Sequence, residues 1–242
     1  MYRVLVTGFG PFGGYSKNPS WLAVSPLHNT VLQPEPISAP ITHGAQEILP
    51  PAKGKRPARA IHITALQVPV TYSDVLSIVP GVHARPPILP SSTDLFPQPP
   101  SGGYDFVLHV GVAPSGTLRI ERLAHKLGYG LPDADNKMPP DLNGIYTTFG
   151  DEMKTTIKTE KLADYLRESG SREVVESNDP GRYLCDFIYY CSLCEAHKTR
   201  AMSASKKAAL VLFLHCSPLN QPHSSEEVTQ AIKLIVEWIS RQ

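Results

Sequence analysis

The chain has 242 residues, 41% of them hydrophobic, and a formal net charge of +1 at pH 7. This length allows a large hydrophobic core, so folding requires neither disulfides nor a structural metal. The nearly neutral charge argues against nucleic acid or an acidic membrane surface as partner. No apolar run approaches the roughly 20 residues of a membrane-spanning helix. The first apolar run breaks at Gly8, so we expect no signal peptide and a cytoplasmic location.

Strand and helix patterns alternate along the chain. Five apolar runs predict strands, at residues 3–7, 60–70, 105–112, 173–176 and 208–215. Helices are predicted from a cap at Asn18 or Ser20 through Trp21 and Val24, over 155–168, over 182–197, and after the capping box Ser224–Glu227. Alternation of this kind indicates an α/β sandwich with a largely parallel sheet.

Two segments do not fit this compact pattern. Residues 33–57 and 84–103 contain six prolines each. Proline-rich segments of this length are typical of exposed loops or insertions. We therefore expect a single domain over residues 1–242 that carries two such loops.

Residues 8–13 match G-x-G-x-x-G directly after the first predicted strand. A dinucleotide site of this type requires a helix that begins at the loop and an acidic residue about 20 positions later. Here the helix cap comes only at Asn18, and the first acidic residue is Glu35 in a proline-rich segment. The motif is better interpreted as a glycine-rich turn that presents Phe9 and Phe12 at the carboxyl edge of the sheet, although both can also be ordinary core residues.

The four cysteines are Cys185, Cys191, Cys194 and Cys216, and we expect all four to be free thiols. A turn at residues 179–181 places Cys185 in the first turn of a helix. The partial positive charge of a helix N-terminus lowers a thiol pKa and favours the nucleophilic thiolate. Alternatively, Cys185 is a small buried hydrophobic residue. Cys191 and Cys194 lie later in the helix, so we interpret them as structural.

A thiolate nucleophile requires a base that can also protonate a leaving amine, and histidine suits this role near neutral pH. Of the nine histidines, His215 ends a predicted strand and so reaches the carboxyl edge of the sheet. Glu121 follows another strand and is a candidate to orient the imidazole, although it can also be a surface residue paired with Arg122 or Lys126. The spacing thus suggests a Cys185–His215–Glu121 site. No cysteine and histidine spacing suits zinc, so no metal is expected.

Several segments together resemble the pyroglutamyl peptidase I (pyrrolidone-carboxylate peptidase) family of cysteine exopeptidases. The matching segments occur in the family's order: VTGFGPFGGYSKNPSW at 6–21, VPVTY at 68–72, LHVGV at 108–112, IERLAH at 120–125, SNDPGRYLCDFIYYCSL at 177–193 and FLH at 213–215. The combination of GRYLC with GFGPFGG is specific.

The resemblance implies a three-layer α/β/α sandwich and a hydrolase that removes an N-terminal pyroglutamyl residue through a thioester, without metal or cofactor. It assigns the nucleophile to Cys185, the acid and base to His215 and the orienting acid to Glu121. Phe9 and Phe12 match residues that line the family's pocket, and Tyr183 and Leu184 lie beside the nucleophile. We expect small pyroglutamyl peptides as partners, and a monomer or weak homo-oligomer. The alternatives are a non-catalytic pyroglutamyl-binding protein on this fold and a nucleotide-binding enzyme.

The chain departs from the family pattern at three places. Pro180 stands where a small residue is usual, Cys216-Ser217 replaces a valine and a proline, and Gly130 stands about where bacterial members have an arginine near the oxyanion site. These departures bear on the fine geometry and the rate, not on the class of enzyme.

Overall fold

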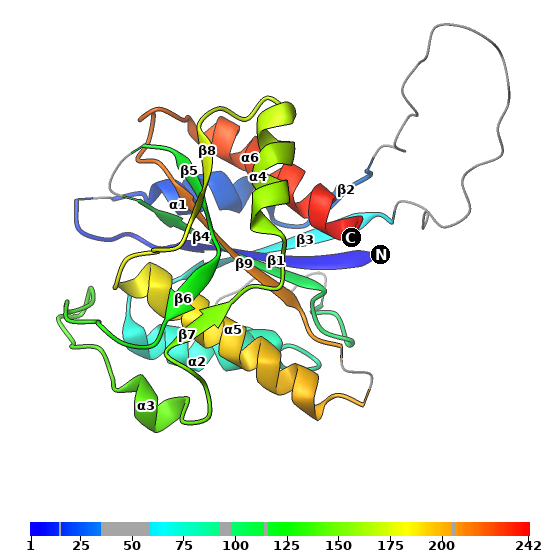
Figure 1. Cartoon of the computed structure of the whole chain (residues 1–242). Helices are drawn as coiled ribbons and strands as arrows, with labels where there is room; N and C mark the ends of the chain where they lie inside the picture. Colours follow the sequence, from blue (N-terminus) through cyan, green and yellow to red (C-terminus); the bar gives the residue numbers. More distant parts are fainter. Residues whose placement is uncertain (15, 35–58, 92–97, 114–115, 205–206) are drawn as a thin grey trace, which may run out of the picture.

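The computed structural model describes residues 1–14, 16–34, 59–91, 98–113, 116–204 and 207–242. Within these residues, seven strands form one sheet, in the spatial order β2 (Thr30–Leu32), β3 (Ile61–Val68), β1 (Tyr2–Phe9), β4 (Phe106–Val112), β9 (Leu210–Cys216), β5 (Leu118–Glu121) and β8 (Val174–Ser177) (Figure 1). Strands β3, β1, β4 and β9 run parallel. Their carboxyl ends therefore lie at one edge of the sheet, whereas β2 and β5 run antiparallel to their neighbours β3 and β9.

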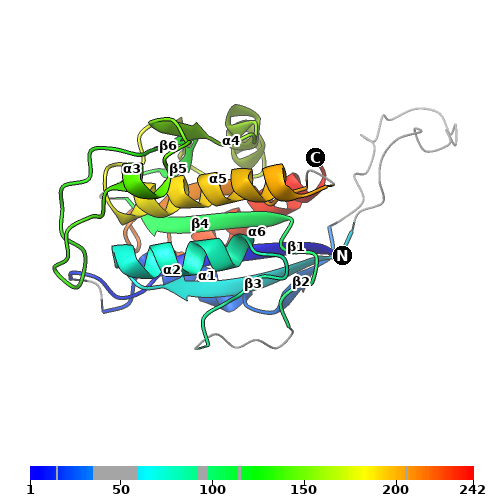
Figure 2. The same cartoon turned by 90° about the horizontal axis from the view of Figure 1, so that it is seen from below.

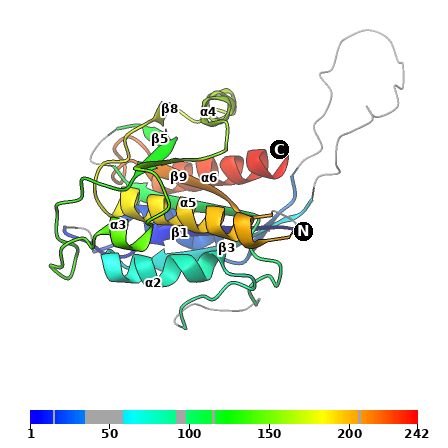
Figure 3. The ribbon, with the colours of Figure 1, turned by 60° about the horizontal axis from the view of Figure 1, so that its bottom comes forward.

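Helices cover both faces of this sheet. Figures 2 and 3 show α2 (Tyr72–His83) and α5 (Leu184–Met202) side by side on one face, and α1 (Pro19–Val24), α4 (Thr159–Glu168) and α6 (Ser225–Ser240) lie on the other. A 3-10 turn, η1 (Ser25–Leu27), follows α1. A separate antiparallel pair, β6 (Leu123–His125) with β7 (Glu152–Lys154), contacts α5, and the short α3 (Leu142–Ile145) lies between β6 and β7 in the chain. This arrangement confirms the three-layer α/β/α sandwich.

Two hydrophobic clusters hold the layers together. Along β4, Phe106, Leu108 and Val110 pack into the cluster under α1, α4 and α6. Val107 faces the cluster under α2 and α5. Both faces of β4 are buried because each is covered by helices, which explains why its sequence is continuously apolar instead of alternating.

The predicted strands and the C-terminal helix are confirmed, including the Ser224–Glu227 capping box. Two predicted helices have different bounds in the structure. The helix predicted over 182–197 is α5, which extends to Met202, and the helix predicted over 155–168 is α4, which begins only at Thr159. Helix α2 was not predicted, because it contains Pro80 followed by glycine, a pair that normally breaks helices.

Residues 35–57 of the first proline-rich segment and 92–97 of the second lie outside the described residues. The described parts of the second, 84–91 and 98–103, contain neither helix nor strand. The single domain with two inserted loops stays a prediction. Of the described helices, none is long and apolar enough to cross a membrane.

Candidate active site

The glycines of the opening loop serve packing and a turn. A Cβ on Gly8 would lie 3.0 Å from both the Ser20 carbonyl oxygen and the Trp21 Cα, so glycine lets α1 approach β1 closely. Gly13 has a φ of 55°, in the left-handed region that favours glycine. Two of the three glycines of the G-x-G-x-x-G spacing, Gly8 and Gly13, thus have a structural explanation that involves no phosphate.

Hydrogen bonds hold this loop at the carboxyl edge of the sheet. Gly10 N donates to the Val68 carbonyl at 2.9 Å, and Phe9 N donates to Ser20 Oγ at 3.0 Å. Asn18 Nδ2 donates to the Gly10 carbonyl at 3.0 Å, and Asn18 also caps α1, one of the two predicted caps. The loop therefore presents a buried Phe9 ring and a Phe12 ring that is 37% exposed.

Helix α5 brings Cys185 onto the sheet. A turn with Gly181 at φ 83° precedes the helix, and Cys185 lies in its first turn, as predicted. Its Sγ lies over Gly111, because a Cβ added there would be only 2.7 Å from the sulfur. Gly111 is the direct neighbour of His215 across the β4–β9 ladder. Neighbouring strands lie about 4.8 Å apart, so Cys185 and His215 share one site.

Sequence reasoning missed Gly111. It is the one glycine in the strand FVLHVGV, which otherwise consists of large apolar residues and a histidine. A glycine inside a strand often marks a close approach of another group, and here that group is the Cys185 sulfur. The clue was present in the sequence, but the identity of the approaching group was not.

His215 and Glu121 form a buried pair. His215 Nδ1 lies 2.7 Å from Glu121 Oε1, and Glu121 is completely buried. The pairing arises because β5 runs antiparallel to β9 and places Glu121 opposite Phe213, two residues before His215 on the same face. The alternative of a surface glutamate is wrong. Tyr189 Oη also donates to the Glu121 carbonyl at 2.9 Å, which ties β5 to α5.

The pKa of the Cys185 thiol is raised, contrary to the expectation from the helix N-terminus. Burial is the largest cause, and negative charge on Cys216, Glu121 and Asp186 adds to it. Desolvation penalises a thiolate more than the helix N-terminus favours it. At neutral pH the group is therefore a thiol, and a nucleophilic role requires a base beside it.

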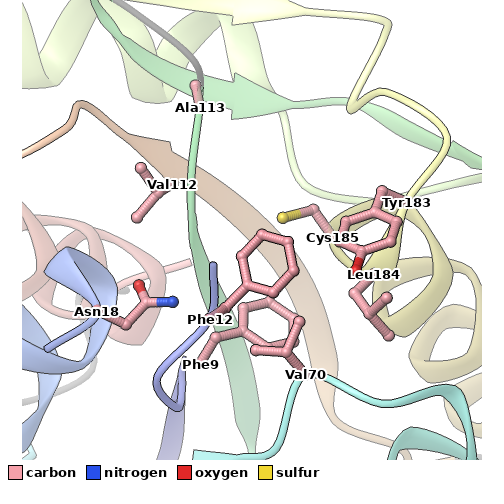
Figure 4. A pocket seen from close by; sticks show the side chains of 9 residues that line it. All are labelled: Phe9, Phe12, Asn18, Val70, Val112, Ala113, Tyr183, Leu184 and Cys185. Atoms are coloured by element: carbon pink, nitrogen blue, oxygen red, sulfur yellow. The ribbon is translucent and has the colours of Figure 1, made fainter. Parts of the chain in front are cut away.

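A pocket of about 160 Å³ opens in front of Cys185 (Figure 4). Among the described residues it is lined by Phe9, Phe12, Asn18, Val70, Val112, Ala113, Tyr183, Leu184 and Cys185. All four predicted binding residues are present, whereas His215 and Glu121 lie outside the lining. Asn18, Val70, Val112 and Ala113 were not predicted. None of the nine carries a formal charge, so the pocket suits a compact neutral group.

Aromatic rings frame the mouth of the pocket. The Phe12 and Tyr183 ring centroids are 5.5 Å apart, and Tyr72 packs edge-on to Tyr183 at 6.2 Å. Tyr183 Oη donates to the Pro132 carbonyl at 3.1 Å, which fixes its ring. Phe12 and Tyr183, from segments far apart in sequence, thus meet at the mouth.

None of the three departures from the family pattern contributes a residue to the pocket lining. Pro180 fits within a turn in which Gly181 N donates to Asp179 Oδ1 at 3.1 Å. Cys216 is buried, and Gly130 is exposed and absent from the pocket lining. All four cysteines are free thiols, as expected. In the described part of the chain, no group of three or more histidine, cysteine or acidic residues is placed to hold a metal ion.

Comparisons with known proteins agree with this geometry. No protein-family model matches the chain. Pyroglutamyl-peptidase 1 of Homo sapiens is 26% identical over 97% of this chain and 88% of its own length. The pyrrolidone-carboxylate peptidase of Thermococcus kodakarensis is 28% identical over 99% of this chain and 98% of its own. The crystal structure of Bacillus amyloliquefaciens pyroglutamyl peptidase I has the same fold, with a TM-score of 0.68, 19% identity, and coverage of 100% of this chain and 98% of that one. The chain is thus similar to pyroglutamyl peptidases over nearly its whole length.

Proposed function

We propose that the chain is a cysteine exopeptidase that removes an N-terminal pyroglutamyl residue from peptides. One observation carries the proposal: Cys185 lies at an uncharged pocket and, over Gly111, beside the His215–Glu121 pair. A nucleophile, a base and a group that orients the base are the three parts that acyl transfer requires. The names of the relatives point to the same reaction.

The pocket supports the choice of acyl group. A pyroglutamyl residue is a five-membered lactam without charge, and the Phe9 and Phe12 rings offer it apolar walls. A free N-terminal residue would bring an ammonium ion into a pocket whose described lining residues include no carboxylate. Burying an unpaired charge costs several kcal/mol, on the order of what separates a substrate from a non-substrate.

In the proposed acylation step, His215 Nε2 accepts the Cys185 proton and Sγ forms a bond to the pyroglutamyl carbonyl carbon. The N–H groups of the first turn of α5 have no partner within the helix and can stabilise the oxyanion. The intermediate collapses as the C–N bond breaks, and His215 gives its proton to the departing amine. Glu121 holds the imidazole and stabilises its charged form. The products of this step are a free peptide and a thioester.

Deacylation uses the same groups in reverse. His215 accepts a proton from water, and the hydroxyl oxygen bonds to the thioester carbon. Collapse breaks the C–S bond, releases pyroglutamate, and returns the proton to Cys185. No redox change occurs, and each proton taken by His215 is given back.

The test is release of a reporter amine from a pyroglutamyl amide, with and without iodoacetamide. Alkylation and Cys185→Ala are each expected to abolish turnover, and the matched control Cys194→Ala, a buried cysteine later in α5, is expected to retain it. Turnover that persists in Cys185→Ala would overturn the mechanism. Binding of a pyroglutamyl peptide by the unmodified chain without turnover would favour the non-catalytic alternative.

Three further parts of the proposal concern the whole chain. We infer that it is one domain, that it acts in the cytoplasm, and that it is a monomer or weak homo-oligomer; four free thiols support a reducing compartment. A single cooperative unfolding transition, cell fractionation and the sedimentation coefficient test these points in turn.

A further inference from the structure

Arg119 lies beside His215 on the next strand of the sheet. In the antiparallel β5–β9 ladder, Arg119 is directly opposite His215. Opposite residues of such a pair project from the same face, with Cβ atoms about 5 Å apart. Leu118 and Ile120, which alternate with Arg119 along β5, pack into the cluster on the other face, under α1, α4 and α6. The half-buried Arg119 side chain therefore leaves the sheet on the face that carries His215.

The same face continues onto the edge strand β8. Val175 is the neighbour of Arg119 in the parallel β5–β8 ladder, and its side chain is 40% exposed. Val174, the residue before it, packs into the cluster on the opposite face. Helices therefore do not fully cover the Arg119 face of the sheet at β8, and solvent reaches it there. We call Arg119 and Val175 together the β5–β8 shelf.

The strand order places this shelf beyond His215 as seen from the pocket. Phe9 and Val112 line the pocket from β1 and β4, and Cys185 lies over β4. His215 is on the next strand, β9, and the shelf follows on β5 and β8. Across the sheet the order is thus pocket, thiol, imidazole and shelf.

This order gives the direction in which a bound peptide leaves the site. In the proposed acylation step the departing amine receives its proton from His215, so the peptide beyond the scissile bond begins at β9. An extended residue advances about 3.4 Å, and neighbouring strands lie about 4.8 Å apart. The first residue of the leaving peptide therefore comes next to Arg119 on β5.

We propose that Arg119 binds a carboxylate on the first residue after the pyroglutamyl group, and so determines which leaving peptides are preferred. The inference rests on the proposed function and deepens it. A guanidinium stays charged at all relevant pH values and matches a carboxylate with two parallel hydrogen bonds. Glu121, the carboxylate two residues further along β5, is hydrogen-bonded to His215. An acidic side chain and a free C-terminus both supply the carboxylate that this site would take.

The test compares two pairs of peptides that differ in one negative charge. Pyroglutamyl-aspartyl amide against pyroglutamyl-asparaginyl amide tests a side-chain carboxylate, and pyroglutamyl-alanine against pyroglutamyl-alaninamide tests a C-terminal one. Chromatography of released pyroglutamate gives kcat/KM. We expect the anionic member of at least one pair to be preferred by about 10-fold, with a preference that weakens as salt is added. The pair that shows the preference identifies the source of the carboxylate, and no preference in either pair overturns the inference.

Three variants assign the preference to the Arg119 charge. Arg119→Gln is expected to reduce the kcat/KM ratio of the pair to about one, and Arg119→Lys, which keeps the charge, to retain most of the preference. A purely structural role of the side chain would not produce this rescue. The matched control is Arg122→Gln, an exposed arginine just after β5, which is expected to keep the preference. If Arg119→Gln does not fold, as judged by circular dichroism, Arg119→Met replaces it. A preference that survives in the folded uncharged variant overturns the inference.

A binding measurement separates this inference from the proposed function. Isothermal titration calorimetry with Cys185→Ala gives the Kd of each peptide without turnover, and we expect the anionic member to bind about 10-fold more tightly. A chain that cleaves none of the peptides but shows this difference in Kd fails only as a peptidase. Cleavage of both members with equal kcat/KM and equal Kd fails only the role of Arg119. Neither cleavage nor binding contradicts both.

Discussion

Two histidines on neighbouring strands illustrate how the partner and the surroundings set the role of a residue. His109 on β4 is fully buried, with Nδ1 2.8 Å from Thr7 Oγ1 and no partner at Nε2 in the described structure. His215 lies near the carboxyl end of β9 and pairs with the Glu121 carboxylate. Burial lowers the pKa of His109 to about 3, so it stays neutral. A histidine that must carry a proton during a reaction requires a carboxylate beside it, and of these two histidines it is His215 that has one.

The largest effect is expected where the carboxylate is neutralised. Glu121→Gln keeps the shape of the side chain but cannot stabilise an imidazolium, so kcat is expected to fall on the order of 10³- to 10⁴-fold. Thr7→Val, which removes the partner of His109, is expected to change kcat less than about threefold, because Thr7 does not touch the reacting groups. Steady-state rates with the pyroglutamyl reporter measure both, and equal losses would refute the distinction between the two histidines.

A second variant changes Gly111, which lies on the same strand as His109, β4, and faces Cys185. In Gly111→Ala the new methyl group would lie 2.7 Å from Cys185 Sγ and 2.8 Å from Phe213 Cζ, so the thiol must move. A displacement of about 1 Å costs about 100-fold in rate. The matched control is Gly144→Ala, where the added carbon has no described atom within 4 Å apart from its chain neighbours and the backbone of its own helix. The same reporter assay decides, and full activity in Gly111→Ala would contradict the placement of Cys185 over this glycine.

The buried histidines predict how stability depends on pH. His83, bonded to Ser192 at 2.7 Å, has its pKa lowered to about 3, as does His109, and burial is the main cause in both. Below pH 6.5 these two histidines are protonated in the unfolded chain but stay neutral in the folded chain. The free energy of unfolding that they contribute above pH 6.5 is therefore lost as the pH falls toward 3. Each histidine contributes about 1.4 kcal/mol per pH unit in this window.

Urea unfolding at pH 4.5, 5.5 and 6.5 measures this slope. His109→Gln retains hydrogen-bonding groups near Thr7 and is expected to remove one histidine's share of the pH dependence. A slope that is unchanged in this variant would show that His109 is protonated in the folded chain. His197, for comparison, lies on α5 and packs against Phe149 nearer the surface, so His197→Gln serves as the control.

The smallest effect concerns the carboxylate next to Cys185. Asp186 is completely buried and accepts from His125 N at 2.9 Å and from Tyr129 Oη at 3.2 Å; burial raises its pKa to about 7. Its negative charge is one cause of the raised Cys185 pKa. Asp186→Asn is therefore expected to lower the pH midpoint of Cys185 alkylation by about half a unit to one unit. An unchanged or higher midpoint would contradict this electrostatic contribution.

The sequence predicted those parts of the site that depend on local chain direction. A turn followed by a helix placed Cys185, and the end of an apolar strand placed His215. The burial of Glu121 was not predictable, because it depends on β5 entering the sheet antiparallel to β9. The sequence of β5, LRIE, also has two charged residues among four, which is not the pattern of a buried strand. A short strand of this composition is indistinguishable from a surface turn until its neighbours are known.

Asn18 shows a second limit of sequence-based prediction. Its position before proline and serine predicted a helix cap, and the structure confirms that cap. The same amide also lines the pocket, but this depends on how β1 and α1 meet at Gly8, where the main chains approach closely. One side chain can serve local structure and a cavity at once, and only the local part is visible in the sequence.

The bond from Tyr189 to the Glu121 carbonyl has a consequence for how the site responds to motion. Tyr189 lies one helical turn after Cys185 on α5. The helix that carries the nucleophile is therefore also hydrogen-bonded to β5, the strand that carries Glu121. If α5 slides or tilts as a rigid rod, it drags β5 along with it. The position of the Cys185 sulfur relative to the Glu121 carboxylate therefore changes less than the position of either group relative to the rest of the protein.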